Sequence, residues 1–307
     1  MSAGWVAGSV RARALARRRL GAAGARQVAA CGSLSEATGV LAGSAYAGAC
    51  RESQGLPAAQ HAVAATVLWN LRVLAGWLPR GGLRLMRPMA GWFEIANIDE
   101  LLEELAGRPA GPRFELGALA TAWPRLGESS SLAELRARLA ASAWKDPGGG
   151  SPLAVRAGVR ARLAERVAAL GGPATAWAAG ALALLVAGER FVAGRPLNPA
   201  VQAAGRNLLG PAAAGARTFA ELRERLPSRL AWVLAPAQAV DEMWRAEAAW
   251  YARVEADGLG LLQSSASDWR PVLGAAAVLA TDAWRAGAAL ELAARGGTPL
   301  EAYDALA

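Results

Sequence analysis

The chain has 307 residues, of which 54% are apolar, and its 33 basic residues outnumber 25 acidic ones to give a net charge of +8. This length allows one large core or two or three domains. Two cysteines and one histidine are too few for a disulfide framework or a zinc site, so a reducing cytosol is the expected compartment.

The positive charge is concentrated towards the N-terminus. Eleven arginines and only two acidic residues precede Glu94, whereas the later 22 basic and 23 acidic residues nearly cancel. This asymmetry predicts an acidic partner or an anionic headgroup layer beside the first third of the chain. An ordinary solvated surface in an arginine-biased sequence is the competing interpretation.

Residues 6–20 are expected to form a helix with a basic face, and Gly21 ends it. No apolar core with a small-residue cleavage site follows, so we do not expect a secretory signal, while a basic, acid-poor mitochondrial-type presequence stays open. The basic residues of this segment are Arg11, Arg13, Arg17, Arg18 and Arg19.

A long helix is predicted over residues 56–78, because Val63, Val67 and Leu71 begin a stripe of apolar residues at three- and four-residue steps. The glycine pair at 81–82 ends it, and a second long helix is predicted over residues 83–105. Two long helices joined by a short turn form an antiparallel hairpin. Residues 107–112, with two prolines and two glycines, are the expected linker.

Similar patterns predict two more segments. The second begins at Phe114 and has long helices over residues 152–170 and 174–192. The third begins near Pro199 and has long helices over residues 231–254 and 272–294, with a glycine break at 258–260 and an amphipathic tail from Pro299. No stretch shows the alternation of a β-strand. The expected fold class is therefore all-α, with helical segments at 1–111, 112–198 and 199–307.

A four-residue box marks each segment and predicts a helix start. The hydroxyl at its first position accepts a backbone N–H one turn later, and the glutamate at its fourth position reaches back to the N–H of the capping residue. A leucine follows eight residues after the hydroxyl and an aromatic residue about thirteen after it. We interpret the boxes as three copies of one helical unit, although an Ala/Leu/Arg-rich chain also produces chance matches. The boxes are Ser33-Leu34-Ser35-Glu36, Ser131-Leu132-Ala133-Glu134 and Thr218-Phe219-Ala220-Glu221; the leucines are Leu41, Leu139 and Leu226, and the aromatics Tyr46, Trp144 and Trp232.

The longest uninterrupted apolar stretch, residues 177–188, is shorter than the ~20 residues that a bilayer requires. A soluble helical protein is the resulting expectation. Alanine contributes most of the apolar character.

Few residues suit catalysis. The only lysine, Lys145, lies in Trp-Lys-Asp-Pro rather than in Gly-Lys-Ser/Thr, so a phosphate-binding loop and nucleotide binding are not expected. The only histidine, His61, lies within the helix predicted over 56–78 and is interpreted as a structural or exposed residue. We assign no catalytic residue, no cofactor and no metal site, and predict that the protein is not an enzyme.

An acidic cluster and the tryptophans are the remaining candidates. Carboxylates between Asp99 and Glu104 could hold Mg²⁺ as in terpenoid synthases, but a second facing acidic motif is missing and a solvated helix face is expected. In the basic third, Trp5, Trp69 and Trp77 stand at helical spacing and are predicted to be core residues. Nucleic-acid binding is therefore not expected.

Three stretches resemble one family. Residues 10–20 with the first box and Tyr46, the sequence Trp-Phe-Glu-Ile-Ala-Asn-Ile at 92–98, and the helix at 280–296 are similar to the V/A-type rotary ATPase socket subunit. This subunit is called C in prokaryotic enzymes and d in eukaryotic V-type enzymes. The resemblance implies a funnel-shaped bundle of three related helical units, without catalytic activity.

The resemblance also implies partners. The funnel would sit on the proteolipid rotor ring, receive the central stalk in its mouth, and couple the stalk to ion transport as a peripheral protein on the cytoplasmic side of the membrane. We hypothesise that Arg11, Arg13, Arg17, Arg18 and Arg19 belong to or border the surface that meets the ring or its lipids. The alternative is an unrelated helical-repeat scaffold that binds another protein.

Overall fold

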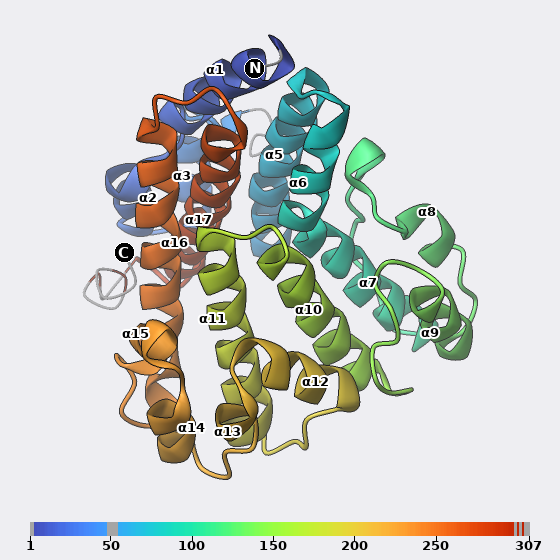
Figure 1. Ribbon diagram of the computed structural model, residues 1–307. Helices are drawn as coiled ribbons and strands as arrows, with labels where there is room; N and C mark the ends of the chain where they lie inside the picture. Colours follow the sequence, from blue (N-terminus) through green and yellow to red (C-terminus); the bar gives the residue numbers. More distant parts are fainter. Residues whose placement is uncertain (1–2, 48–54, 298–299, 301–302, 304–307) are drawn as a thin grey trace. The chain divides into compact units, whose positions relative to one another are not determined.

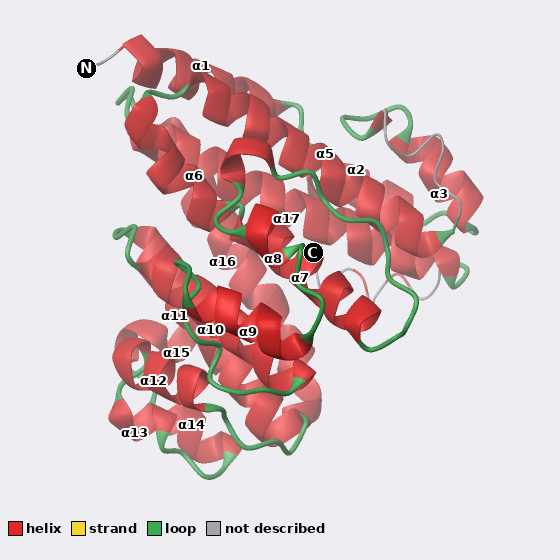
Figure 2. Ribbon diagram, turned by 90° about the vertical axis from the view of Figure 1, so that its right-hand side faces the viewer, coloured by secondary structure: helices red, strands yellow, loops and turns green. Residues whose placement is uncertain are grey.

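The computed structural model describes residues 3–47, 55–297, 300 and 303, and within these ranges every regular element is a helix (Figure 2). The expected all-α class is confirmed. The contacts divide the chain into two compact units, unit 1 (Met1–Met86 with Tyr251–Ala307) and unit 2 (Arg87–Trp250). Of the expected segments, 112–198 lies within unit 2, whereas 1–111 and 199–307 each include residues of both units.

Unit 1 is built around its last helix, so the end of the chain packs with its beginning (Figure 1). In α17 (Trp269–Ala294), 17 of 26 residues are buried, and this helix packs against α1, α2, α3 and α5 as well as against the end of α16. The other helices are α1 (Ala3–Arg17), α2 (Gly21–Ala29), α3 (Leu34–Leu41), α5 (Leu56–Trp77), the first part of α6 (Leu83–Met89) and the end of α16 (Met243–Gln263). The apolar stripe predicted on α5 is buried.

Small residues explain how closely α16 and α17 approach. A Cβ atom added to Gly274 would lie 2.5 Å from the carbonyl oxygen of Gly258, so neither backbone could come this close with a larger residue. The predicted glycine break at 258–260 is therefore wrong: these residues lie inside α16. The long helix predicted over residues 231–254 is also wrong: α15 (Ala231–Leu234) ends just before Pro236, which has no backbone N–H to continue the helical hydrogen bonds.

The helix predicted over residues 83–105 is divided in two. After the 3₁₀ turn Arg80–Gly82, α6 ends at Met89, and α7 (Gly91–Leu105) begins after Ala90, whose φ of −92° and ψ of 0° lie outside helical values. Pro88 supplies no backbone N–H and weakens the last turn of α6. The division of the chain into units falls within α6.

Unit 2 contains two apolar clusters. One surrounds Ile98, Leu135 and Val159, and the other surrounds Leu182 and Val201. Figure 1 shows α10 beside α11, and its contacts extend to α7 and α12. The helices after α7 are α8 (Trp123–Leu126), α9 (Leu132–Ala140), α10 (Pro152–Ala168), α11 (Pro173–Ala187), α12 (Pro199–Leu208), α13 (Pro211–Ala214), α14 (Phe219–Arg225), α15 and the start of α16; 3₁₀ turns lie at Gly117–Leu119, Ser228–Leu230 and Val240–Glu242.

The most apolar helix of unit 2 matches the helix predicted over residues 174–192. It continues from α11 through a π-helical turn, Gly188–Val192, so that by length and composition Pro173–Val192 could cross a membrane. A core helix of a soluble protein meets the same criterion, and 44% of this apolar stretch is buried. This helix is longer than the uninterrupted apolar stretch at 177–188 on which the sequence-based expectation rested, so length and composition alone do not exclude a membrane span.

All three boxes start a helix as predicted. The side chains of Ser33, Ser131 and Thr218 each accept the N–H of the glutamate three residues later, at 3.1–3.2 Å. The predicted return bond is displaced by one residue, because each glutamate accepts the N–H of the residue before the cap, at 2.8–2.9 Å. The glutamates therefore also fix the direction from which the chain enters the helix.

Candidate functional site

The most distinctive concave surface of unit 1 is a cavity of about 480 Å³, which we call the arginine cavity. Side chains from α1, the turn after it, the segment after α3, α5 and α17 line it. The polar and aromatic lining residues on which the argument depends are Arg11, Arg18, Arg19, Tyr46, Trp69 and Asp282.

Helix geometry places two of these arginines together. Arg11 and Arg18 are seven residues apart, close to two turns, so they lie on one face, with the buried Leu15 between them. Both are exposed, and neither forms a hydrogen bond or ion pair with another described residue. Their charges are therefore available to a ligand or partner.

The other three arginines that the sequence singled out have different surroundings. Arg13 donates to the carbonyl oxygens of Leu262 at 3.0 Å and of Ser264, and so ties α1 to the segment after α16. Arg19 lines the cavity and lies 3.9 Å from Glu255. Arg17 is exposed but does not line the cavity. Three of the five predicted residues therefore share one site.

The floor of the arginine cavity contains a buried carboxylate. Asp282, only 1% exposed, accepts the backbone N–H groups of Leu20 at 3.0 Å and Gly21 at 2.7 Å, and the hydroxyl of Tyr46 at 2.7 Å. Gly21 has a φ of +72°, which a glycine adopts without strain. The start of α2 thus presents its N–H groups to the acid, an arrangement that stabilises a buried negative charge.

Unit 2 contains the same arrangement with different residues. Glu94 of α7, 1% exposed, accepts the backbone N–H groups of Thr121 at 2.6 Å and Ala122 at 2.8 Å, and the indole N–H of Trp144 at 2.8 Å. We call these two arrangements the carboxylate junctions. In each, the acid of a long helix joins the start of a short helix to the aromatic residue thirteen positions after a box serine.

A serine positions the aromatic residue in both junctions. Eleven residues after the cap, Ser44 accepts the backbone N–H of Tyr46 at 3.1 Å, and Ser142 accepts that of Trp144 at 3.0 Å. Each serine also donates to the carbonyl of the box leucine, at 2.7 and 2.8 Å. In the third box, Trp232 instead donates to the carbonyl of Arg229 at 3.0 Å.

Arg166 extends the junction of unit 2. Its guanidinium carbon lies 4.6 Å from the ring centroid of Trp144, and its Nη2 donates to the hydroxyl of Thr121 at 2.7 Å. Burial lowers the pKa of the Arg166 guanidinium, and the charge of Glu94 opposes this shift. The junction therefore combines a buried anion with a partly buried cation and an aromatic ring.

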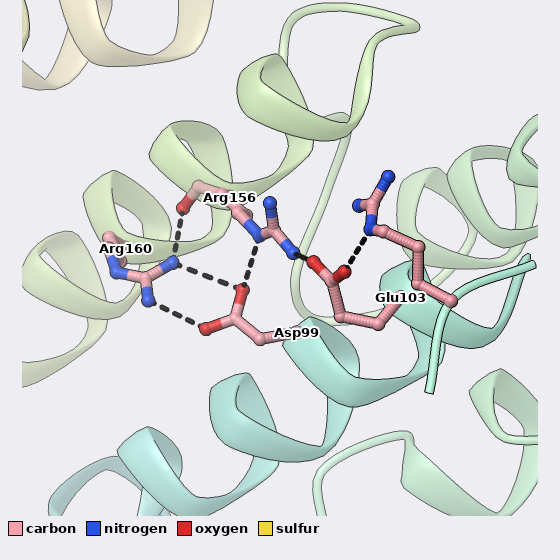
Figure 3. A network of polar contacts seen from close by, with 5 residues as sticks. Asp99, Glu103, Arg156 and Arg160 are labelled. Atoms are coloured by element: carbon pink, nitrogen blue, oxygen red, sulfur yellow. Dashed lines mark hydrogen bonds and ion pairs between the residues drawn. The ribbon is translucent and has the colours of Figure 1, made fainter. Parts of the chain in front are cut away.

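Carboxylates of the acidic cluster of α7 form ion pairs with arginines, whereas the sequence predicted a solvated helix face (Figure 3). Asp99 lies 2.6 Å from Arg160 and 3.4 Å from Arg156, and Glu103 pairs with both Arg156 and Arg108. Hydrogen bonds from Arg108 and then Arg156 lower the pKa of Glu103 to about 2. These guanidinium groups occupy the oxygens that Mg²⁺ would require, so the cluster does not suit a metal.

Two tryptophans correct the sequence analysis. Trp69 is 59% exposed and Trp77 is 54% exposed, so the prediction that both are core residues is wrong. Trp69 stands on the side of α5 that faces away from the buried stripe and lines the arginine cavity, whereas Trp77 is the last residue of the helix. Thr66 and Asn70, which flank Trp69 on α5, also line it. The polar residues Thr66 and Asn70 were the feature of the sequence that could have indicated this surface.

Among the described residues, neither the single histidine nor Cys31 belongs to a group that suggests catalysis or metal binding. His61 is partly buried on α5. Cys31 is buried, and burial together with the charge of Glu36 raises the pKa of its thiol. Cys50 and most of the tail expected from Pro299 lie outside the described residues. Among the described residues, no group of three His, Cys, Asp or Glu side chains is arranged to hold a metal ion.

Comparisons with known proteins assign no family to the chain. No model of a protein family matches the sequence. No curated protein matches it either.

Proposed function

We propose that the protein is a non-catalytic central-stalk subunit of a V/A-type rotary ATPase, which couples the rotating stalk to the membrane proteolipid ring for ion transport. The carboxylate junctions carry this proposal. They show that one set of residues recurs along the chain: an acid in a long helix, a short helix, a capping box and an aromatic side chain.

Two of the stretches that resemble the socket family contribute these residues. Glu94 lies in the Trp-Phe-Glu-Ile-Ala-Asn-Ile stretch, and Asp282 lies in the helix at 280–296. Both acids serve as structural anchors, which explains why such residues would recur in a helical repeat. A third unit around Thr218, and closure of three units into a funnel on the cytoplasmic face of the membrane, are parts of the proposal.

The charge of unit 1 supports the proposed location beside a membrane rotor. Arg11 and Arg18 carry charges that no described residue neutralises. Acidic loops of a rotor ring, or anionic lipids around it, would meet such a surface favourably. The alternative, a helical scaffold for another protein, fits the repeated junctions but gives no reason for charges that no described residue pairs with.

A coupling measurement tests the proposal. Deleting the chain from its source cells should abolish ATP-driven ion uptake by inverted membrane vesicles, while the detached head subunits still hydrolyse ATP. Uptake should return when the wild-type chain is added back. Unchanged uptake in the deletion strain, with hydrolysis at the wild-type level, would reject the socket role.

A further inference from the structure

We propose that the arginine cavity binds the phosphate group of an anionic phospholipid, with Trp69 at its mouth in the headgroup layer. The inference deepens the proposed peripheral contact with the membrane and rests on it for its biological setting. The proposed ligand is a lipid and not an acidic protein, and the test uses the purified protein with vesicles, inorganic phosphate or an oligonucleotide.

The charges of the cavity favour an oxyanion. Arg11, Arg18 and Arg19 line it, against the single carboxylate of Asp282, whose oxygens already accept three hydrogen bonds. The buried acid is therefore satisfied by the protein and does not need the arginines. Guanidinium groups offer a planar pair of N–H donors that matches two oxygens of a phosphate.

The neutral lining residues suit the rest of a headgroup. Thr66 and Asn70 of α5 provide hydroxyl and amide groups beside the arginines. These groups can exchange hydrogen bonds with glycerol or sugar hydroxyls. The cavity thus combines charged donors for a phosphate with neutral donors and acceptors for the atoms attached to it.

Exposed apolar side chains favour a lipid layer over a soluble phosphate. Trp69 is 59% exposed, and the guanidinium of Arg72 lies 5.7 Å from its ring centroid. Val10, next to Arg11 on α1, is 62% exposed. Tryptophan and arginine are the residues that concentrate at membrane–water interfaces, where an apolar ring and a cation are both accommodated.

The test compares two pairs of substitutions that remove the same charge. One is Arg11→Gln with Arg18→Gln, inside the cavity. The other is Arg80→Gln with Arg84→Gln, two exposed arginines of unit 1 outside it. Binding of the full chain is measured by sedimentation with phosphatidylcholine vesicles, with and without 30% phosphatidylglycerol, at about 0.1 M salt, where charges separated by more than about 10 Å are largely screened.

We expect binding to the anionic vesicles only. The cavity pair should weaken it about 30-fold, because each basic residue at such a surface contributes about fivefold, and the control pair should weaken it about twofold or less. Trp69→Phe should reduce the quenching of protein fluorescence by brominated lipid. All four arginine positions are exposed, and matching thermal unfolding curves would confirm that the variants fold.

Three outcomes would overturn the inference. Equal losses for the two pairs would show that only net charge matters. Binding of inorganic phosphate that the cavity pair abolishes, without vesicle binding, would assign the cavity to a soluble phosphate. Tighter binding to a single-stranded oligonucleotide than to anionic vesicles would assign it to nucleic acid. Failure of lipid binding would leave the ion-uptake test of the socket role untouched, so the two proposals can fail separately.

Discussion

Glu94→Gln tests the carboxylate junction of unit 2 most sharply. The substitution keeps the shape of the side chain but replaces one of two acceptor oxygens by an NH₂ donor. The three donors around Glu94 are the N–H groups of Thr121, Ala122 and Trp144, at 2.6–2.8 Å. The amide group of glutamine accepts hydrogen bonds only at its oxygen, so at least one of these three N–H groups would face the NH₂ donor.

The magnitude follows from the burial of the site. Glu94 is 1% exposed, so water cannot replace a lost partner. Hydrogen bonds to a charged group contribute about 1.5–3 kcal/mol each, and a buried donor left without a partner costs about 1–3 kcal/mol. We therefore expect Glu94→Gln to lower the free energy of unfolding by about 2–4 kcal/mol. For a urea m-value of about 2 kcal/mol/M, the midpoint falls by about 1–2 M.

The assay is urea unfolding followed by far-UV circular dichroism, with Glu104→Gln as the matched control. Glu104 lies on the same helix, its side chain is 60% exposed, and it pairs with Arg113 at the surface, where ion pairs contribute about 0–1 kcal/mol. A double-mutant cycle with Trp144→Phe should return a coupling of about 1 kcal/mol or more. If Glu94→Gln changed the midpoint no more than Glu104→Gln does, the junction would not stabilise the fold and the reasoning would be refuted.

The remaining predictions concern single contacts. Tyr46→Phe should lower the free energy of unfolding by about 1.5–3 kcal/mol, because it removes the hydroxyl that donates to the buried Asp282; a loss below 0.5 kcal/mol in urea titration would contradict this. Gly274→Ala should be destabilising, since its Cβ would lie 2.5 Å from the Gly258 carbonyl, whereas Gly287→Ala on the same helix has open space and should be neutral or stabilising by up to about 1 kcal/mol; melting temperatures check the order. Ser131→Ala should cost about 1 kcal/mol through loss of the cap, which amide exchange in α9 would report. The pKa of Glu103 is lowered to about 2 from an unfolded value of about 4.3. The contribution of its ion pairs to the free energy of unfolding is therefore present above about pH 4.3 and is lost as the pH falls towards 2. The stability difference between wild type and Glu103→Gln should shrink over that range, and a difference independent of pH would be inconsistent with the ion pairs.

Local signals in the sequence predicted local structure well. The capping boxes placed three helix starts correctly, because a hydroxyl and a glutamate at this spacing satisfy N–H groups that belong to the helix itself. The apolar stripe of α5 also identified its buried face. Both signals depend on residues within one or two turns of each other, so no knowledge of the rest of the fold was needed.

Contacts between residues far apart in the chain could not be predicted from the sequence. Glycine at 258 indicated a break, yet it permits the close approach of α17, a helix that begins eleven residues later. The pairing of Asp282 with Tyr46 joins residues 236 positions apart. An acid among the apolar residues of a long helix was a usable sign of a buried anchor, but nothing local identified its donors.

The candidate site was predicted in part. The arginine-rich first helix was recognised, but its spacing alone did not separate Arg11 and Arg18, which line the cavity, from Arg13, which binds backbone carbonyls. The exposure of Trp69 was missed because its aromatic side chain was assigned to the core, although it lies on the side of α5 opposite the apolar stripe that the sequence had identified.

The most direct test of the proposed function is to identify what the protein binds. The tagged chain is purified from its own detergent-solubilised membranes, and the captured proteins are identified by mass spectrometry against a capture with the tag alone. The account predicts recovery of a small proteolipid together with central-stalk subunits of a rotary ATPase. Recovery of soluble partners without a proteolipid would contradict it and favour the helical scaffold.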